Sequence, residues 1–525
     1  MWSLTAAQRE DVVQRLVASI CALAHARGQE ITAEVAEAVA SGVEKKAYTA
    51  AEVAARTTTG SRPLAETTSN YARKLGELAI QAVKDGCQLE GAPVVGASGK
   101  VEHIDLHGSR DFLTAESTEA LLAPMLAPES SVTKIRFSTK SFGRDAAAVA
   151  ARAIGCVASI LREADISDVI AGRPEDEALD ALRVLSSALA GAPGLTVLNL
   201  SDNALGEKGV RACEAVLAGQ APIESLSLQN VGLSVHACRA TAELLAGDKA
   251  GSLKRLQLFN NMSGDEGAAH IASLLARAPK LEDLRFASSR VGPAGGIALA
   301  KSLSAGHCLV KLDLSDNPLT SEVAAELAKA LAHQPRLSIL NLNDTSLGPD
   351  GVVTLCQGLL TSYGATDNKP AHQLTELGLA LNEVDPAAAK AVAALVAAHA
   401  GTLRSLNLRE NELADRGAVT IARALAAVKA PVTVDLVGNQ IKRVGVVAVA
   451  KAVAPKASLE LLALDENFIS EEGMDELRSV MAAAGKAAAL GPLDENMEED
   501  DEEDDEDEDD GEDYGLGAAL QRLGV

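Results

Sequence analysis

Asn230 and the polar residues at matching positions before and after it are the side chains of this sequence whose type and spacing favour chemistry. The stretch Leu228-Gln229-Asn230-Val231 places a carboxamide where a predicted strand ends and turns towards solvent. A carboxamide offers both donors and acceptors, so it can hold a partner amide in one orientation. Acids and other polar residues recur at equivalent places, namely Asp168, Asp202, Asn260, Ser288, Asp316, Asp344, Glu410 and Glu466. We expect these side chains to form an acidic rim on which a basic protein docks, although any solvated edge can carry such a column.

Arg173 follows the Ile166 strand onto the same predicted rim. It lies two strands before the one that ends at Asn230, so we expect the two residues to be on the order of 10 Å apart. Arg173 either contacts a partner or braces the rim through nearby carboxylates. The carboxylates around it, which favour bracing, are Asp168, Glu175, Asp176 and Glu177.

The sequence shows no pattern of a self-contained active site. It has no Gly-rich phosphate loop with its Lys, no His/Cys cluster at metal-ligand spacing and no G-x-S-x-G turn. The nine His residues are scattered over unrelated segments. We therefore expect no metal site, and a binding surface rather than an enzyme in its own right.

A repeated apolar frame positions the polar column. The stretch Leu195-Thr-Val-Leu198-Asn-Leu200-Ser-Asp-Asn203-Ala-Leu205 reads L-x-x-L-x-L-x-x-N-x-L, the pattern of a leucine-rich repeat. Its alternation predicts a short strand with one buried face, and the spacing of Val210, Cys213 and Leu217 predicts a helix after it. The second strand leucine marks thirteen units, at Leu106, Phe137, Ile166, Leu200, Leu228, Leu258, Phe286, Leu314, Leu342, Leu379, Leu408, Leu436 and Leu464. The predicted fold class is therefore α/β: a curved leucine-rich repeat solenoid of parallel inner strands and outer helices, with a small all-α N-terminal domain.

Most units carry an Asn three places after the marker, where it would satisfy backbone groups inside the stack. We call this the ladder position; it is occupied by Asn203, Asn261, Asn317, Asn382, Asn411, Asn439 and Asn467. In the Leu228 unit the ladder position is Val231, and an Asn stands one residue earlier. Either this displaced Asn serves a partner, or it reflects repeat degeneracy, because Ser289 and Thr345 also deviate.

The composition limits the class of protein and the cellular compartment that the sequence can indicate. The chain has 525 residues, 47% of them hydrophobic and 2% aromatic, which predicts thin core layers of Leu, Ala and Val. No apolar run is long enough to span a membrane. Seven widely spaced cysteines and no signal-peptide pattern predict reduced thiols in a cytosolic or nuclear setting. Residues 494–513 hold 17 acidic residues, so the rest of the chain carries −8 of the net charge of −25. This negative charge argues against nucleic acid as a partner.

Three regions are predicted. Residues 1–90 read as helices, residues 91–485 as the repeats and residues 486–525 as an acidic tail with a short apolar end. Residues 364–370 lie in the long spacing before Leu379 and are predicted to form a surface loop. Charge repulsion predicts that the tail is disordered.

Three segments, in order, resemble the Ran GTPase-activating protein family. The family pattern is a G-R segment, then an L-S-D-N-A-hydrophobic-G repeat, then an L-x-N-x-G repeat. The matching segments are Gly172-Arg173-Pro-Glu-Asp-Glu177-Ala-Leu, Leu198-Asn-Leu-Ser-Asp-Asn203-Ala-Leu-Gly206 and Leu228-Gln-Asn230-Val-Gly232-Leu. With the N-terminal region and the acidic tail, the resemblance extends over nearly the whole chain.

The N-terminal region is similar to the WPP domain of plant-type members of this family. The similarity rests on Trp2, Glu44-Lys-Lys-Ala-Tyr48 and Tyr71-Ala-Arg-Lys74 before Ile80. Trp2-Ser3-Leu4 stands where that domain has Trp-Pro-Pro, so targeting to nuclear-envelope coiled-coil proteins through Trp2 is an open expectation. A helical cap that closes the first repeat is the alternative.

The resemblance implies stimulation of GTP hydrolysis by Ran without an arginine finger. Asn230 matches the family residue that positions the GTPase's own catalytic Gln, and Arg173 matches the family's Arg. The resemblance also implies that this chain needs no cofactor, because GTP and Mg²⁺ belong to the GTPase. We expect a monomer that binds Ran in its GTP form, with a Ran-binding protein as a further candidate, in the cytoplasm or at the nuclear envelope, in support of nucleocytoplasmic transport.

Two other functions fit the sequence less closely. A non-catalytic scaffold, such as an inhibitor of the ribonuclease-inhibitor type, would use surface aromatics, which are scarce at 2%. An acidic-tailed histone- or chromatin-binding protein would bind through its tail. Hydrolysis by Ran with and without the chain separates these alternatives.

Overall fold

The computed structural model describes residues 6–26, 36–48 apart from 38 and 46, 64–84, 94–95, 101–361 apart from 305 and 307, and 373–497. The chain divides into two compact units, Met1–Asp111 with Ala127–Lys140 and Phe112–Leu126 with Ser141–Val525. Three predicted features lie outside the described residues: Trp2, the loop at 364–370 and the acidic segment from 498 onward.

Helices α1 (Ala6–Ala26) and α3 (Leu64–Lys84) belong to the first unit and share an apolar core that includes Ile20 and Val83. A polar cluster lies inside this core. The buried carboxylate of Glu44 accepts hydrogen bonds from Arg9 Nε at 2.7 Å and from the Tyr71 hydroxyl at 2.9 Å. Burial, followed by the bond to Glu44, raises the pKa of Tyr71. Two residues of the WPP-like similarity, Glu44 and Tyr71, therefore hold these helices together.

The first unit also contains strands β1 (Val94–Val95), β2 (Val101–Asp105) and β4 (Lys134–Arg136). Strand β1 pairs antiparallel with β2, and β2 pairs parallel with β4. The boundary between the units falls within the short strands β3 (Asp111–Leu113) and β5 (Lys140–Phe142).

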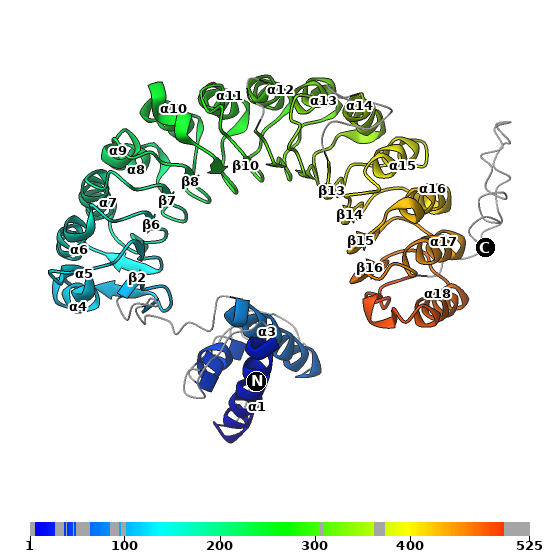
Figure 1. Cartoon of the computed structure of the whole chain (residues 1–525), viewed down its shortest axis with the longest axis horizontal. Helices are drawn as coiled ribbons and strands as arrows, with labels where there is room; N and C mark the ends of the chain where they lie inside the picture. The colour runs from blue at the N-terminus through cyan, green and yellow to red at the C-terminus, as the bar shows by residue number, and fades with distance from the viewer. Residues whose placement is uncertain are drawn as a thin grey trace. The chain divides into compact units, whose positions relative to one another are not determined.

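A parallel sheet of three-residue strands forms the frame of the second unit, with strands on one side of the repeat array and helices on the other (Figure 1). Neighbouring strands pair without a register shift, so that Leu198, Leu226 and Leu256 align across three of them and are buried. The strands are β6 (Glu163–Asp165), β7 (Val197–Asn199), β8 (Ser225–Ser227), β9 (Arg255–Gln257), β10 (Asp283–Arg285), β11 (Lys311–Asp313), β12 (Ile339–Asn341), β13 (Glu376–Gly378), β14 (Ser405–Asn407), β15 (Thr433–Asp435) and β16 (Leu461–Ala463). A strand ends immediately before each of the thirteen predicted markers, which confirms the leucine-rich repeat fold.

The helices of the second unit cover the other side of its sheet. The helix predicted from Val210, Cys213 and Leu217 is divided at Cys213, although all three side chains are buried as predicted. Burial raises the pKa of the Cys213 thiol to about 12, so this group stays protonated. The helices are α4 (Ala115–Leu121), α5 (Ala123–Leu126), α6 (Arg144–Val157), α7 (Glu175–Ala190), α8 (Gly206–Ala212), α9 (Glu214–Leu217), α10 (Val235–Leu244), α11 (Gly264–Leu275), α12 (Pro293–Leu303), α13 (Ala324–Leu331), α14 (Gly348–Leu360), α15 (Ala388–Ala398), α16 (Ala414–Ala427), α17 (Arg443–Val453) and α18 (Glu471–Ala483), with 3-10 turns at Gly247–Ser252, Ser321–Val323 and Ala487–Ala489. Over the described ranges, no helix combines the length and apolar character that crossing a membrane requires.

Buried Asn side chains at the ladder position join successive repeats, as predicted. Asn261 is representative: its Oδ1 accepts from the Val231 and Leu233 amides, and its Nδ2 donates to the Leu228 and Leu258 carbonyls. Each such Asn satisfies backbone groups of the preceding turn that water cannot reach. The ladder therefore fixes the turns from which the rim side chains project.

Candidate functional site

The predicted rim residues share one backbone conformation. Each lies three residues after the end of its strand and has a positive φ, between 48° and 65°. Asn, Asp and Gly tolerate this left-handed region better than other residues do. The rim column consists of Asp168, Asp202, Asn230, Asn260, Ser288, Asp316, Asp344, Leu381, Glu410, Gly438 and Glu466. The backbone of the turn therefore accounts for part of the Asp and Asn content of this column, independently of any docking role.

Asn230 lies in a line of hydrogen bonds along this column. Its Nδ2 donates to Asp202 Oδ1 at 2.9 Å, and its Oδ1 accepts from Asn260 Nδ2 at 3.1 Å. The three residues follow the adjacent strands β7, β8 and β9. All three residues are exposed to solvent. The Asn230 carboxamide is therefore hydrogen-bonded to a neighbour on each side along the column, and its solvent-facing edge is open to a partner.

Two shallow hollows flank this line. One, of about 670 Å³, is lined by Ile170, Arg173, Leu179, Asp202 and Lys208, among others. The second, of about 500 Å³, is lined by Asn230, Asn260, Met262, Arg290 and Asp316, among others. The hydrogen bond between Asp202, which lines the first hollow, and Asn230, which lines the second, connects the two linings.

Arg173 is bonded within the chain and is mostly covered. Its Nε donates to Ser141 Oγ at 3.0 Å, and its Nη2 donates to the Ser141 carbonyl at 2.8 Å. Its Nη1 forms an ion pair with Glu177 at 3.3 Å, and its guanidinium carbon lies 5.0 Å from the ring centre of Phe112. The Arg173 side chain is 16% exposed. These contacts agree with a brace, supplied by Ser141 and Phe112 as well as by a carboxylate.

Gly143 leaves room for this brace. A Cβ added to it would lie 2.4 Å from Glu177 Oε1 and 2.9 Å from Arg173 Nη1. Of the other predicted carboxylates near Arg173, Glu175 forms an ion pair with Lys208. Ser141 and Phe112 were not predicted as partners of Arg173, because they lie 32 and about 60 residues before it in the chain.

Comparison with known proteins identifies the family. The leucine-rich repeat family model matches residues 194–212 and 400–422. RAN GTPase-activating protein 2 from Arabidopsis thaliana is 37% identical over 436 residues, which cover 81% of this chain and 77% of that protein. The chain belongs to the Ran GTPase-activating protein family. RAN GTPase-activating protein 1 from the same plant is 44% identical over 158 residues, 30% of this chain and 29% of its own. Ribonuclease inhibitor from Sus scrofa is 28% identical over 352 residues, 57% of this chain and 76% of its own.

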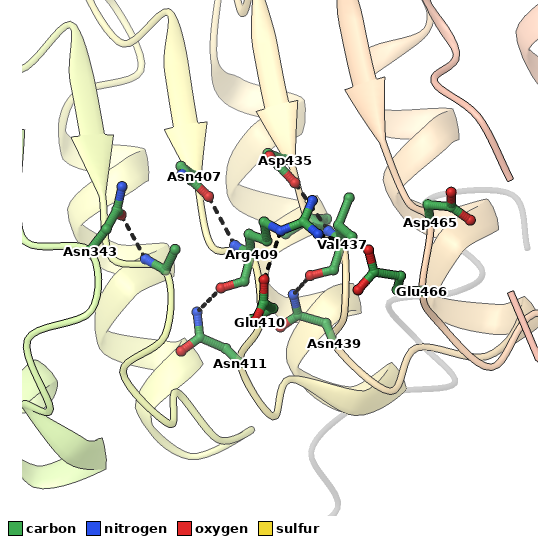
Figure 2. Close-up of polar contacts among 12 residues, drawn as sticks. Asn343, Asn407, Arg409, Glu410, Asn411, Asp435, Val437, Asn439, Asp465 and Glu466 are labelled. Carbon is green, nitrogen blue, oxygen red and sulfur yellow. Dashed lines mark hydrogen bonds and ion pairs between the residues drawn. The ribbon is translucent and has the colours of Figure 1, made fainter. Parts of the chain in front are cut away.

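In this member of the Ran GTPase-activating protein family, the rim is unevenly charged. Burial, followed by the charges of Asp316 and Glu410, raises the pKa of Asp344. Further along, Arg409 donates to Glu410 at 2.9 Å and to Glu466 at 2.8 Å (Figure 2). Arg409 therefore offsets part of the acidic charge at that end, whereas the charges of Asp316 and Glu410 act on Asp344.

Arg409 was not among the residues expected on the rim. A signal was present, because Arg409 directly follows the marker Leu408 as Gln229 follows Leu228. Val169 was likewise not predicted to deviate: it occupies the ladder position of the repeat that carries Arg173, as Val231 does beside Asn230. Among the described residues, no group of three or more His, Cys, Asp or Glu side chains is arranged to hold a metal ion.

Proposed function

We propose that this chain is a GTPase activator that accelerates the hydrolysis of GTP bound to Ran. The observation that carries the proposal is its 37% identity to RAN GTPase-activating protein 2 over 81% of this chain and 77% of that relative. The activator contributes a docking rim and one positioned carboxamide, and the chemistry takes place on the partner. GTP and Mg²⁺ are held by the GTPase, and this chain needs no cofactor.

Asn230 is the residue that acts on the reaction in this proposal. A carboxamide has two N–H donors and two acceptor lone pairs. Within the described residues, Asn230 uses one donor on Asp202 and accepts one bond from Asn260. The remaining N–H and lone pair hold the carboxamide of the GTPase's catalytic Gln, which orients the attacking water. Hydrolysis of this kind depends chiefly on positioning and charge stabilisation, so a fixed carboxamide can speed it without forming a covalent bond.

Arg173 acts as a brace and not as an arginine finger in this mechanism. A finger must be free to reach the transferring phosphoryl group. Arg173 is instead bonded to Ser141 and Glu177, beside the hollow that Asp202 lines. The contacts support a role in holding the start of α7 and the wall of that hollow.

Arg173→Ala is expected to lower the maximal rate of Ran·GTP hydrolysis less than removal of the Asn230 side chain does. The loss arises because the wall of the hollow loosens, so Ser141→Ala, which leaves the arginine present, should reproduce part of it. Single-turnover hydrolysis at saturating activator measures both variants. If Arg173→Ala abolished turnover with affinity and melting intact, and Ser141→Ala had no effect, an arginine finger would replace the brace.

Docking is expected to depend on salt, because Asp316, Asp344 and their neighbours give the rim an acidic field for a basic partner. Raising ionic strength from about 0.05 M to 0.5 M shortens the screening length to below about 5 Å and should lower the association rate with Ran·GTP by roughly tenfold or more. Stopped-flow association at a series of salt concentrations is the measurement. Equal association rates at the lowest and highest salt concentrations would mean that the rim is not part of the docking surface.

The decisive test of the proposed function is GTP hydrolysis by Ran in the presence and absence of this chain, repeated with residues 494–525 removed. Acceleration by the shortened chain supports the repeats as the active part. Binding of Ran·GTP without acceleration would favour a non-catalytic scaffold, and binding lost with the tail would favour an acidic-tailed chromatin protein.

We also propose that the chain works as a monomer in the cytoplasm, in support of nucleocytoplasmic transport. A Ran-binding protein would act with it on Ran·GTP, and residues 1–90 would anchor it at the nuclear envelope. The similarity of Glu44, Tyr48 and Tyr71 to the WPP domain supports an anchor, while Ser3 and Leu4 depart from that domain. Fluorescent tagging of residues 1–90 alone, and of the chain without them, tests this part.

A further inference from the structure

The hydrogen bonds on either side of Asn230 have a direction. An ionised carboxylate can only accept, so the bond between Asp202 and Asn230 requires that Nδ2 of Asn230 faces Asp202. Oδ1 of Asn230 then faces Asn260, whose Nδ2 donates to it. The line therefore runs as donor to acceptor from Asn260 through Asn230 to Asp202. Turning the Asn230 carboxamide over would place its oxygen against the Asp202 carboxylate, which cannot donate, whereas Asn260 could turn over with it.

We infer that Asp202 and Asn260 are positioning residues: they hold the Asn230 carboxamide in the one orientation that presents its free N–H and free lone pair correctly to a partner. The inference rests on the proposed function of Asn230. The two ends of a free carboxamide are interchangeable by rotation about its last side-chain bond, so an isolated Asn on a rim would present either arrangement. The Asp202 carboxylate excludes one arrangement because it can only accept, and Asn260 stabilises the remaining one by donating to Oδ1.

The backbone keeps the three side chains in line. All three residues are in the left-handed region, with φ of 61°, 50° and 57°. The amide of each one bonds to a carbonyl of the next repeat: Asp202 to Gln229, Asn230 to Phe259 and Asn260 to Ala287, at 2.8 to 3.1 Å. The spacing of the side chains is thus set by the interlocked turns and does not depend on which polar group each carries.

Exchanging the two neighbours tests the direction of the line. Asp202→Asn removes the group that fixes Nδ2, and Asn260→Asp places a second carboxylate against Oδ1. Both substitutions keep residue types that tolerate a positive φ, so neither should strain the turn. Asp202→Asn leaves both orientations of the Asn230 carboxamide available, so we expect it to lower the maximal hydrolysis rate at saturating activator by about twofold. Asn260→Asp removes the donor to Oδ1 and is expected to lower that rate by roughly tenfold.

The double variant Asp202→Asn with Asn260→Asp is the informative one. It has the net charge of the parent and can rebuild the same line in the opposite direction, with the Asn230 carboxamide turned over. We expect its melting curve and its half-saturating concentration for Ran·GTP to return to the parental values. The maximal rate should stay at least roughly tenfold low, because the outward donor and acceptor have changed places.

The outcomes separate this inference from the proposed function. Parental maximal rates in the double variant would overturn the inference, since the line would then serve only structure or net charge. Unchanged maximal rates in both single variants would overturn it as well. Full activity after removal of the Asn230 side chain would instead overturn the proposed function, whatever the neighbours do.

Discussion

Asn230→Ala is expected to bind Ran·GTP with near-parental affinity and to lose roughly 10²–10³-fold of the stimulated hydrolysis rate, as loss of a single positioned polar group in a transition state typically does. The side chain is exposed, and its bonds are to two other exposed side chains, so the core of the repeat does not depend on it. Single-turnover hydrolysis at saturating activator measures the rate, and a binding titration separates that rate from affinity.

The positive φ of Asn230 adds a complication that a glycine variant removes. An alanine at φ 50° is strained by about 1 kcal/mol, more than a change on an exposed rim usually costs. Asn230→Gly removes the same side chain without strain, and Gly438 already occupies the column at φ 65°. The two variants should therefore lose the same fraction of the stimulated hydrolysis rate, whereas the alanine variant should unfold at a lower temperature than the glycine variant.

Glu466→Gly is the matched control on the same column. It also has a positive φ, and its side chain pairs with Arg409 near the end of the array. We expect its maximal hydrolysis rate to stay within about twofold of the parent, because exposed changes far from Asn230 act mainly on binding. If Asn230→Gly stimulated Ran as well as Glu466→Gly does, the residue would be a repeat irregularity.

The fold was predictable because it depends on local periodicity. Alternating leucines specify short strands, and one buried Asn per turn specifies the ladder. A strand therefore ends immediately before each marker, as it does before Leu200 and Leu408. The outward position of Asn230 followed from the same frame. In both cases the necessary information lies within about a dozen consecutive residues.

The remainder of the site depends on neighbours one repeat away. Asp202, Asn230 and Asn260 are 28 and 30 residues apart, and their hydrogen bonds become visible only once the repeats are in register. Arg173 shows the same limit: the nearby acids suggested its partners, but Ser141 supplies two of its bonds from the preceding repeat. Patterns within one repeat do not contain these pairings.

The adjacent residue in the ladder, Asn261, should have the opposite phenotype to Asn230. Its buried carboxamide bonds to the Val231 and Leu233 amides and to the Leu228 and Leu258 carbonyls. Asn261→Ala removes the side-chain partner of the two amides and of the Leu228 carbonyl, whereas the Leu258 carbonyl still accepts from Ser289 Oγ. We expect a loss of about 3–5 kcal/mol in unfolding free energy. Because a repeat array can unfold in parts, a denaturant melt alone does not report a local loss of stability. Hydrogen exchange of the individual amides should therefore be measured as well.

Asn317→Ala separates this loss of stability from loss of function. Asn317 makes the same set of bonds to the turn that contains Ser289 and Val291, so its replacement should cost a similar amount of unfolding free energy. The Asn261 bonds, however, fix the two ends of the turn that carries Asn230. We therefore expect Asn261→Ala to speed exchange of the Val231 and Leu233 amides and to lower the maximal hydrolysis rate by roughly tenfold, while Asn317→Ala spares both. Equal hydrolysis by the two variants would mean that the ladder does not position Asn230.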